Sequence, residues 1–483
     1  MILGWAMAAF AADVPAPAAV TAPGADPAAT TDVAAPLGPD RTGPPTVAAP
    51  EVLTLPEPEV HPISPGVTAL YVRAPGARKV AVQVVVRRGL VELEQNPTQL
   101  GRAIGAMADA AAGDLTGAEL SSQRDLIEAE LWSSIRLHEG EVSLLIPADD
   151  LGKGLDLQRL IVEAPSFPKK DLKRYVTDQR LFYTVNGPAS QANVAASALA
   201  FAWFPPDHPY GVRPNLAELD QVKTKALVSR WRGWLTSSPI TVLVVGDIDW
   251  STIEPQVRAL TAGLGAEAPV GRALPVTAPS ATKVVGVDMP GQAQVAVRIR
   301  FAAPPRDDAD NAAMTATNFL LGGHFLSRLN RNLREDKGFT YGAGSSYNYG
   351  ETWGSVTVQV DVKREDVAAT VTEIRKELGR LCTEPVPPEE LDAMRRSLDA
   401  DWNNTFTTAD VAAGLYRRAL AADWTIAHVK ERLVAIDGVT PAGEDRPGVW
   451  VFVGDRKAVE PALGTVGLEA GWTDPAAAIL GKF

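Results

Sequence analysis

The sequence predicts an α+β protein made of two homologous α/β sandwich domains, each a mainly antiparallel sheet covered by helices. Three observations lead to this prediction: blocks of sequence recur in the same order in two halves, strand and helix patterns alternate within each half, and 46% of the residues are hydrophobic while 22% are charged. That composition is typical of a globular protein, and 483 residues suffice for two or three domains of roughly 150–250 residues.

The recurring blocks indicate an internal duplication. In the first half, a Pro75-Gly76 turn separates two valine-rich runs at 67–72 and 79–86 that have strand character. Similar blocks follow in the same order at a nearly constant offset: Pro290-Gly291 lies between 284–287 and 294–301, 167–172 corresponds to 386–391, and 241–247 corresponds to 449–455. Three co-linear blocks predict two copies of one fold.

Within a copy, the predicted strands and helices each have one apolar face. Residues 355–362 alternate strictly, so that four valines share one face of a strand. Residues 367–381 then place apolar side chains three or four positions apart, which predicts a helix with one apolar face. A sheet covered on its apolar face by such helices is a two-layer sandwich.

The N-terminal region is predicted to be an export signal followed by a spacer. Residues 2–12 form a short apolar run with Ala-Phe-Ala at 9–11, although no Lys or Arg precedes Arg41, so a positive n-region is missing. We expect the following boundaries: a signal peptide at 1–12, a disordered Pro/Ala-rich linker at 13–60, an N-terminal domain at 61–265, an inter-domain linker at 266–281 and a C-terminal domain at 282–476. The expected location is the periplasm or the exterior of the cell.

Charge and cysteine content exclude several classes of function. The chain carries 46 Lys and Arg against 58 Asp and Glu, a formal charge of −12, and it has no basic stripe, so nucleic acid is not an expected partner. The single cysteine, Cys382, excludes an internal disulfide and a cysteine-based zinc cluster. No apolar stretch after the N-terminus is long enough to span a membrane.

The most informative segment is residues 320–342. Phe325, Leu329 and Leu333 recur every four residues, which predicts a helix with one buried stripe, and Lys337-Gly338 is typical of a helix end. Phe339 and Tyr341 are expected to begin the next strand and to point to the same face of it.

This segment resembles the second domain of the M16 metallopeptidases, the pitrilysin and mitochondrial processing peptidase-like family, in its short two-domain form. The shared features are a Gly-Gly helix opening, Ser-Arg-Leu, and a Leu-Arg-Glu run that leads to Gly and Tyr; the likeness extends over about residues 64–475. The resemblance implies a fold that forms half of a chamber, closed by a second subunit.

The resemblance also implies roles for particular residues. Arg334 and Tyr341 match the pair that completes a peptidase site held by the partner, where a phenol can donate to an oxyanion and a guanidinium can hold a peptide carbonyl. The residues implied to bind substrate are Gly322, Gly323, His324 and Ser327.

The zinc motif of the family is missing from this chain. Arg102, Gly105 and Ala106 occupy the positions of the His-x-x-Glu-His motif, and the region of the third ligand, 174–181, offers Asp178 and Gln179 but no glutamate. None of the five histidines lies three to five residues from another. We therefore expect no cofactor bound by this chain and zinc in a partner subunit.

Two functions remain open. The first is the non-zinc subunit of a heterodimeric M16-like metallopeptidase, which pairs with a zinc-binding homologue and acts on peptides or unfolded segments. The second is a catalytically inactive pseudopeptidase that serves as a scaffold or peptide-binding module. Among the other histidines, His138 is expected in an exposed turn and His208 in a turn where it serves packing.

Overall fold

The computed structural model describes residues 56–93, 98–270, 274–404, 407–429 and 447–483. The predicted signal peptide and almost all of the predicted N-terminal linker lie outside these residues. The first strand begins at Glu59, so the last two residues of the predicted linker belong to a strand. Among the described helices, none is long and apolar enough to cross a membrane.

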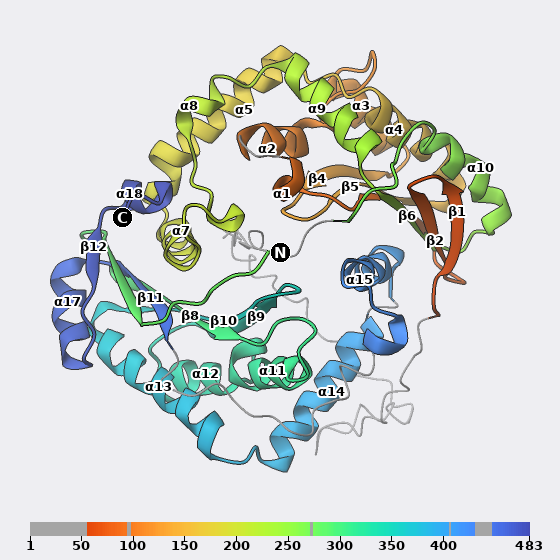
Figure 1. The fold of residues 1–483 in the computed structure, drawn as a ribbon. Helices are drawn as coiled ribbons and strands as arrows, with labels where there is room; N and C mark the ends of the chain where they lie inside the picture. Colours follow the sequence, from red (N-terminus) through yellow and green to blue (C-terminus); the bar gives the residue numbers. More distant parts are fainter. Residues whose placement is uncertain (1–55, 94–97, 271–273, 405–406, 430–446) are drawn as a thin grey trace, which may run out of the picture. The chain divides into compact units, whose positions relative to one another are not determined.

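The first sheet has six strands in the order β1-β2-β6-β3-β5-β4 (Figure 1). All neighbouring pairs are antiparallel except β2 with β6. Its strands are β1 (Glu59–Ser64), β2 (Val67–Arg73), β3 (Lys79–Val86), β4 (Glu130–Ile135), β5 (Gly140–Pro147) and β6 (Ile240–Gly246).

The second sheet repeats this arrangement in the order β12-β7-β11-β8-β10-β9. Its strands are β7 (Lys283–Asp288), β8 (Gln294–Ala303), β9 (Ala343–Tyr349), β10 (Gly354–Lys363), β11 (Gly448–Gly454) and β12 (Gly471–Thr473). Strand β11 is parallel to β7 and antiparallel to β8, as β6 is to β2 and β3. The outer strands differ, because β12 is parallel to its neighbour and β1 is antiparallel. The predicted α+β class with two helix-covered, mainly antiparallel sheets is confirmed.

The two Pro-Gly turns make the same hydrogen bond in the two halves. The amide of Gly76 donates to the carboxylate of Asp247 at 2.9 Å, and the amide of Gly291 donates to that of Asp455 at 3.2 Å. Both glycines have φ near +80°, a backbone conformation that other residues rarely adopt. Asp247 directly follows strand β6, and Asp455 directly follows strand β11. In each half, the hydrogen bond therefore holds the Pro-Gly turn at the end of that central strand.

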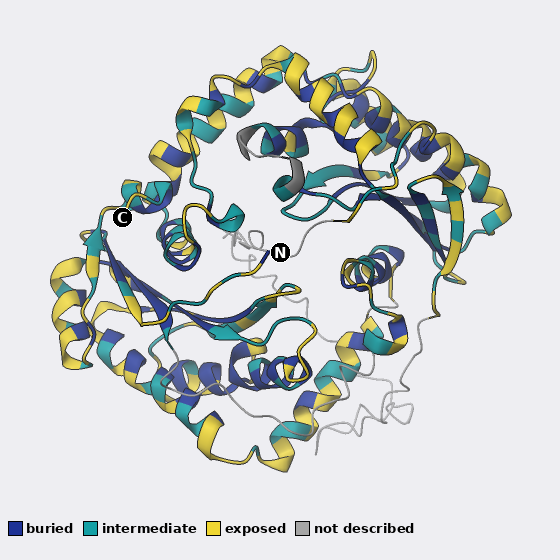
Figure 2. Cartoon of the chain, viewed as in Figure 1, coloured by how far each residue is buried: buried dark blue, intermediate teal, exposed yellow. Residues whose placement is uncertain are grey.

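Helices cover the outer face of each sheet (Figure 2). The first core lies between sheet one and helices that include α2 (Thr98–Met107), α4 (Leu151–Glu163), α9 (Thr224–Ser237) and α10 (Trp250–Leu260). The second core lies between sheet two and helices that include α13 (Val367–Thr383) and α17 (Arg456–Thr465). Trp231 and Trp234 of α9 supply large buried side chains to the first core. Tight burial of these apolar faces is the main stabilising term for both layers.

The longer helices of the first half are α2 (Thr98–Met107), α3 (Gly117–Leu126), α4 (Leu151–Glu163), α5 (Lys169–Leu181), α7 (Gln191–Trp203), α9 (Thr224–Ser237) and α10 (Trp250–Leu260); the shorter pieces are α1 (Leu90–Leu93), η2 (Phe182–Asn186), α6 (Gly187–Ala189) and α8 (Leu216–Leu219). Those of the second half are α11 (Asn311–Asn318), η4 (Phe319–Gly323), α12 (Arg328–Asn330), η5 (Arg331–Asp336), α13 (Val367–Thr383), α14 (Pro388–Asn404), α15 (Ala409–Ala421), α17 (Arg456–Thr465) and α18 (Pro475–Leu480).

Each half contributes one helix that packs on the sheet of the other half. Helix α15 of the second half packs on β3 and β6 of the first, where Ala413 and Tyr416 are buried against Leu243 and Val245. Helix α7 of the first half packs on β8 and β11 of the second, and the side-chain Nε2 of Gln191 donates to the backbone carbonyls of Gln294 and Val453 at 2.7 Å each. Each sheet therefore has its second face covered by the other half.

The stretch between the halves is the predicted inter-domain linker, at residues 266–281. Residues 266–270 and 274–281 contain neither helix nor strand, and residues 271–273 lie outside the described residues.

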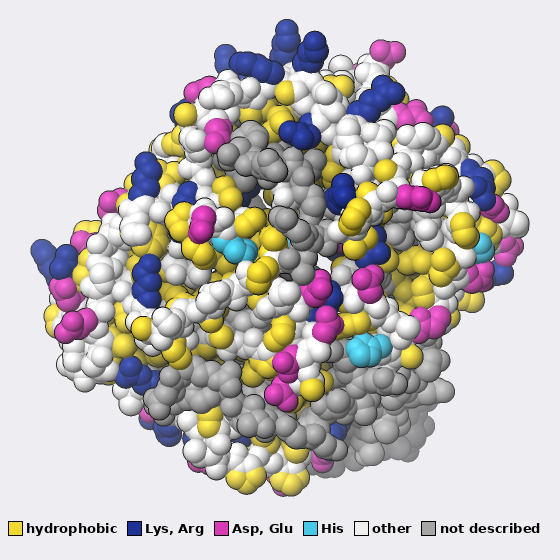
Figure 3. Space-filling view, in the orientation of Figure 1, with side chains coloured by type: hydrophobic (Ala, Val, Ile, Leu, Met, Phe, Trp, Pro, Cys, Tyr) yellow, Lys and Arg dark blue, Asp and Glu magenta, His cyan; other side chains and the backbone are white. Residues whose placement is uncertain are grey.

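On the face drawn in Figure 3, Lys and Arg side chains are scattered among Asp and Glu rather than gathered in one stripe.

Candidate functional site

The segment with the family-like motif folds as two short helical pieces rather than one helix. The π-helix η4 ends at Gly323, and a turn over residues 324–327 leads into α12, which continues as the π-helix η5. Leu329 and Leu333 are fully buried, as predicted. The prediction for Phe325 is wrong: its side chain is 61% exposed, because the helix restarts only at Arg328 and leaves Phe325 in the turn.

The segment after η5 also differs from its prediction. The helix does end where Lys337-Gly338 predicts, since Gly338 has φ +66° and its amide donates to the carbonyl of Arg334. The next strand, however, begins at Ala343, and Phe339 and Tyr341 do not share a face: Phe339 packs against the second core, whereas Tyr341 is 92% exposed.

Tyr341 is exposed, and Arg334 is half-buried. The guanidinium of Arg334 lies over the ring of exposed Phe325, with its carbon 4.4 Å from the ring centroid, a distance typical of a cation–π contact. Tyr341 makes no hydrogen bond with any of the described residues, and a phenol at this exposure is free to donate to a ligand. The contact with Phe325 restricts the orientation of Arg334 while its charge stays available.

Asn330 is a positioning residue that the sequence motif does not reveal. Its side chain is buried, donates to the carbonyl of Phe325 at 2.6 Å and accepts from the amide of Ala343 at 3.1 Å. One amide thus connects the turn that carries Phe325 to the start of the strand that follows Tyr341. An asparagine inside a helical run is the only sequence signal, and it is weak because such residues are common there.

The four residues expected to bind substrate have different environments. Gly322 is buried, and a Cβ there would lie 2.3 Å from the amide nitrogen of Ser345 in β9. Gly323 is exposed. The ring of His324 stacks on Phe319 at 4.2 Å, and its Nδ1 lies 2.9 Å from the carbonyl of the same residue. Ser327 is 1% exposed, and its hydroxyl has no partner among the described residues. Their role in binding stays a prediction.

Helix α2 has no metal-binding side chains at the three motif positions. Arg102 donates from Nη1 to the hydroxyl of Tyr183 in η2 at 3.2 Å. Gly105 carries no side chain and packs against β4, where a Cβ would lie 2.8 Å from the amide nitrogen of Ile135, and Ala106 is exposed. A guanidinium donates hydrogen bonds and has no lone pair to offer a metal, so this set does not fit zinc.

The third-ligand region gives the same result. Asp178 is exposed and Gln179 is half-buried on α5, while the residue that actually reaches Arg102 is Tyr183, two positions beyond the stretch considered in the sequence. Burial raises the pKa of the neighbouring Tyr175 to about 12. Within the described residues, no group of three His, Cys, Asp or Glu side chains is placed to hold a metal ion.

The other histidines serve packing. His138 is half-buried rather than exposed, because its ring meets Tyr210 edge-on and Nε2 bonds the Tyr210 hydroxyl; burial lowers its pKa to about 4. His208 lies in the predicted turn, where Nδ1 accepts from the amide of Tyr210. Neither belongs to a group of three His, Cys, Asp or Glu side chains that could hold a metal ion in the described part of the chain.

Comparison with known proteins identifies the relatives of this fold. Residues 222–398 match the family model described as the peptidase M16 inactive domain. A search of curated proteins finds no match to the chain.

Solved structures are similar over most of the chain. The peptidase M16 inactive domain from Pseudomonas fluorescens has a TM-score of 0.73 at 17% identity, covering 82% of this chain and 98% of its own. A protease from Helicobacter pylori has a TM-score of 0.69 at 16% identity, covering 83% and 100%. The periplasmic protease PqqL from Escherichia coli has a TM-score of 0.62 at 16% identity, covering 88% of this chain but 49% of its own. At these identities the likeness establishes the fold.

Proposed function

We propose that this chain is the non-zinc subunit of a two-chain M16-like metallopeptidase, because residues 222–398 match the peptidase M16 inactive domain and the fold is similar to that of a solved M16 inactive domain. The observation that carries the proposal is the exposure of Tyr341, with Arg334 half-buried, at the spacing the family uses. A chain kept only as a scaffold has no need to hold an arginine over an exposed aromatic ring or to keep a tyrosine 92% exposed seven residues later.

The two side chains have complementary chemistry for peptide hydrolysis. The hydroxyl of Tyr341 can donate to the oxyanion that develops on a peptide carbonyl, and such a donor contributes about 10²–10³ in rate. The guanidinium of Arg334 can hold a neighbouring backbone carbonyl with two donors. Phe325 orients Arg334, and Asn330 fixes the turn that carries Phe325. The substrates would be peptides or unfolded segments, with the glycines at 322 and 323, His324 and Ser327 near the bound backbone.

A partner subunit is needed for the reaction, because the residues on α2 do not fit zinc. The size of one relative supports a paired assembly: this chain matches only about half of the PqqL protease, so that protein is roughly twice as long. We propose that a zinc-binding homologue takes the place of the missing half, and that the domains at 61–265 and 282–476 form this chain's part of the chamber.

The proposed location is the periplasm or the exterior of the cell. Two observations support it: the apolar run at residues 2–12 has the length of a secretory signal, and one structural relative is described as periplasmic.

The test combines this chain with a zinc-motif homologue encoded near it. Peptidase activity is measured on fluorogenic peptides with each protein alone and with the mixture, and we expect activity from the mixture only. Tyr341→Phe should then lower kcat by roughly 10²–10³ without changing the melting temperature, since the side chain is exposed. Tyr349→Phe, a change to another exposed tyrosine of the same segment, is the control. An unchanged kcat for Tyr341→Phe would remove the assigned role.

The alternative is a pseudopeptidase that binds peptides or organises an assembly. The observation that favours it is the description of the matching family model as an inactive domain. It is preferred if pull-down experiments recover no zinc-binding homologue while peptide binding by the isolated chain is retained.

A further inference from the structure

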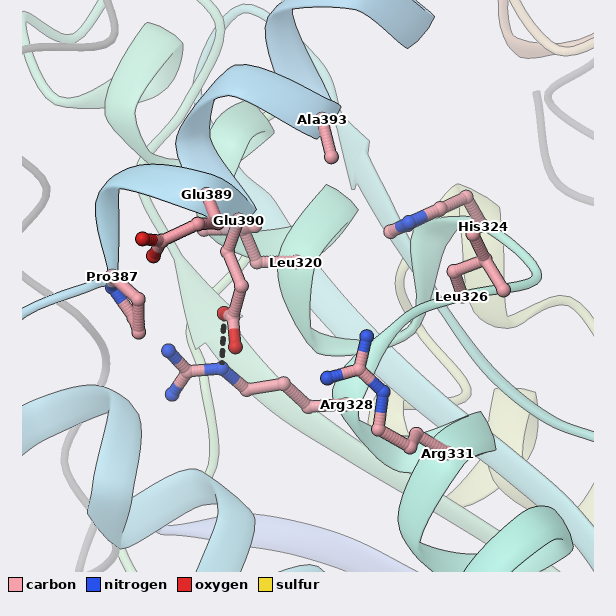
Figure 4. Close-up of a pocket in the computed structure, with 9 residues that line it drawn as sticks. All are labelled: Leu320, His324, Leu326, Arg328, Arg331, Pro387, Glu389, Glu390 and Ala393. Atoms are coloured by element: carbon pink, nitrogen blue, oxygen red, sulfur yellow. Dashed lines mark hydrogen bonds and ion pairs between the residues drawn. The ribbon is translucent and has the colours of Figure 1, made fainter. Parts of the chain in front are cut away.

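A pocket of about 310 Å³ lies next to the turn that carries Phe325, between that turn and the start of α14 (Figure 4). Its volume is at the lower end of the range for small-ligand sites, roughly 300–1,000 Å³. One side is formed by His324, Leu326, Arg328 and Arg331, and the other by the first turns of α14. The pocket is separate from Arg334 and Tyr341, neither of which lines it.

Arg328 is a buried charge that is only partly satisfied. Its side chain is 6% exposed, and its Nε donates to the carboxylate of Glu390 at 2.9 Å. Its Nη1 is buried and has no hydrogen-bond partner among the described residues. A buried charged donor without an acceptor costs free energy, and it leaves this wall of the pocket with positive charge that Glu390 compensates only in part.

The remaining charges of the pocket favour an anion. Arg331 is exposed, and it forms no ion pair with any described residue; Figure 4 shows its guanidinium turned toward the interior of the pocket. The carboxylate of Glu389 points away from the interior in the same view, and that of Glu390 is already engaged by Arg328.

The rest of the lining is apolar. Leu320, Leu326, Pro387 and Ala393 supply the surface around the two arginines. From these observations we infer that the pocket binds a carboxylate carried on an apolar body, held by Arg331, while Arg328 with its ion pair to Glu390 forms the wall beside it. The inference draws on the proposed function only in taking a peptide as the carrier, whose carboxylate is its C-terminus or an acidic side chain.

The experiment measures binding to the full chain alone, so it does not depend on any partner or on peptidase activity. Three labelled N-acetylated hexapeptides are compared by fluorescence anisotropy: one ending in a free Leu carboxylate, its C-terminally amidated twin, and the amidated peptide with one internal Glu. We expect the free-carboxylate peptide to bind at least tenfold more tightly than the amidated twin. Tighter binding of the Glu peptide instead would assign the carboxylate to a side chain.

Two variants test the pocket from opposite sides. Arg331→Gln removes the charge and should weaken binding about tenfold to hundredfold, as expected for a charge-assisted hydrogen bond. Ala393→Trp fills the pocket from an exposed position without changing any charge, and it should abolish the preference for the carboxylate. Arg396→Gln, a change to an exposed arginine of α14 that does not line the pocket, is the control.

The inference is overturned if the three peptides bind equally or not at all, or if Arg331→Gln and Arg396→Gln have the same effect. Either result leaves the proposed role of Tyr341 untouched, because that role is measured as kcat in the two-chain mixture. Loss of the Tyr341→Phe effect, conversely, leaves a carboxylate preference of the isolated chain intact.

Discussion

Arg102 of α2 donates to the hydroxyl of Tyr183 across 3.2 Å, and this contact joins the helix that carries the three zinc-motif positions to η2, the segment that follows α5. Arg102 also favours ionisation of nearby Tyr175, although burial has the larger effect and leaves the pKa of that phenol raised. The hydrogen bond between Arg102 and Tyr183 is therefore a polar contact between α2 and η2.

The first prediction concerns restoration of the zinc motif. The triple substitution Arg102→His, Gly105→Glu and Ala106→His should not create a tight zinc site, because Tyr183 supplies no carboxylate and the Arg102 contact is lost. It should also destabilise the fold, since a Cβ at 105 would lie 2.8 Å from the amide nitrogen of Ile135. We expect Gly105→Ala alone to cost about 1 kcal/mol, overpacking being partly offset by the better helix propensity of alanine.

The measurements are zinc content after dialysis and the free energy of unfolding in urea. Zinc retained stoichiometrically by the triple variant would contradict the assignment of this region. Gly152→Ala in α4 is the matched control, because a Cβ there meets nothing within 4 Å. That change should be neutral or slightly stabilising.

Much of the fold could be predicted from the sequence because the strands have strong local signals. The valine runs at 79–86 and 294–301 are the strands β3 and β8, and the alternating run at 355–362 is β10. The packing of α7 and α15 on the sheet of the opposite half could not be predicted in this way. A helix such as α7 is apolar on most of its surface, and its sequence does not specify which of two similar sheets it covers.

The site was predicted less well than the fold, for a local reason. The four-residue spacing of Phe325, Leu329 and Leu333 is compatible with a single helix, and only the turn before Arg328 places Phe325 outside it. That turn is stabilised by Asn330 through contacts 5 and 13 residues away, which periodicity does not detect. Likewise Tyr183 reaches Arg102 across 81 residues of sequence.

The second prediction separates the two glycines that open the motif. Gly322→Ala should destabilise the protein by about 2 kcal/mol, because the added Cβ would meet backbone of β9 that has no room to move. Gly323→Ala should cost less, since its nearest atom is 3.0 Å away and the residue is exposed. Urea denaturation of the two variants measures the difference. Equal destabilisation would mean that the approach of η4 to β9 is not the constraint.

The third prediction concerns the ion pairs that link α15 to the first sheet. Arg417 lies 2.6 Å from Glu139 and 3.7 Å from Glu141, whose side chain is only 4% exposed. Arg417→Met leaves both carboxylates to share Arg136, so we expect a loss of about 3 kcal/mol that added salt does not mask. Arg456→Met, which breaks the exposed pair with Glu460, should give no measurable change. Similar losses in the two variants would show that burial of the α15 contact is unimportant.

The fourth prediction is a pH dependence that originates at His138. Burial lowers its pKa from 6.5 to about 4 in the folded protein, so the unfolded chain takes up a proton on this side chain at a higher pH than the folded chain does. The contribution of His138 to stability is therefore complete above pH 6.5 and is lost as the pH falls toward 4. The shift corresponds to a loss of about 3 kcal/mol over this window.

The pH effect is isolated by comparison with His138→Gln. Carboxylates also titrate below pH 5, but they do so in both proteins, so the difference between the two stability curves reports the histidine alone. At pH 8 the variant should be less stable, because it loses the contact with the Tyr210 hydroxyl. Between pH 6.5 and 4 the gap should close and then reverse, since only the wild type pays for keeping its imidazole neutral. Parallel curves across that window would show that His138 is protonated in the folded protein at the same pH as in the unfolded chain.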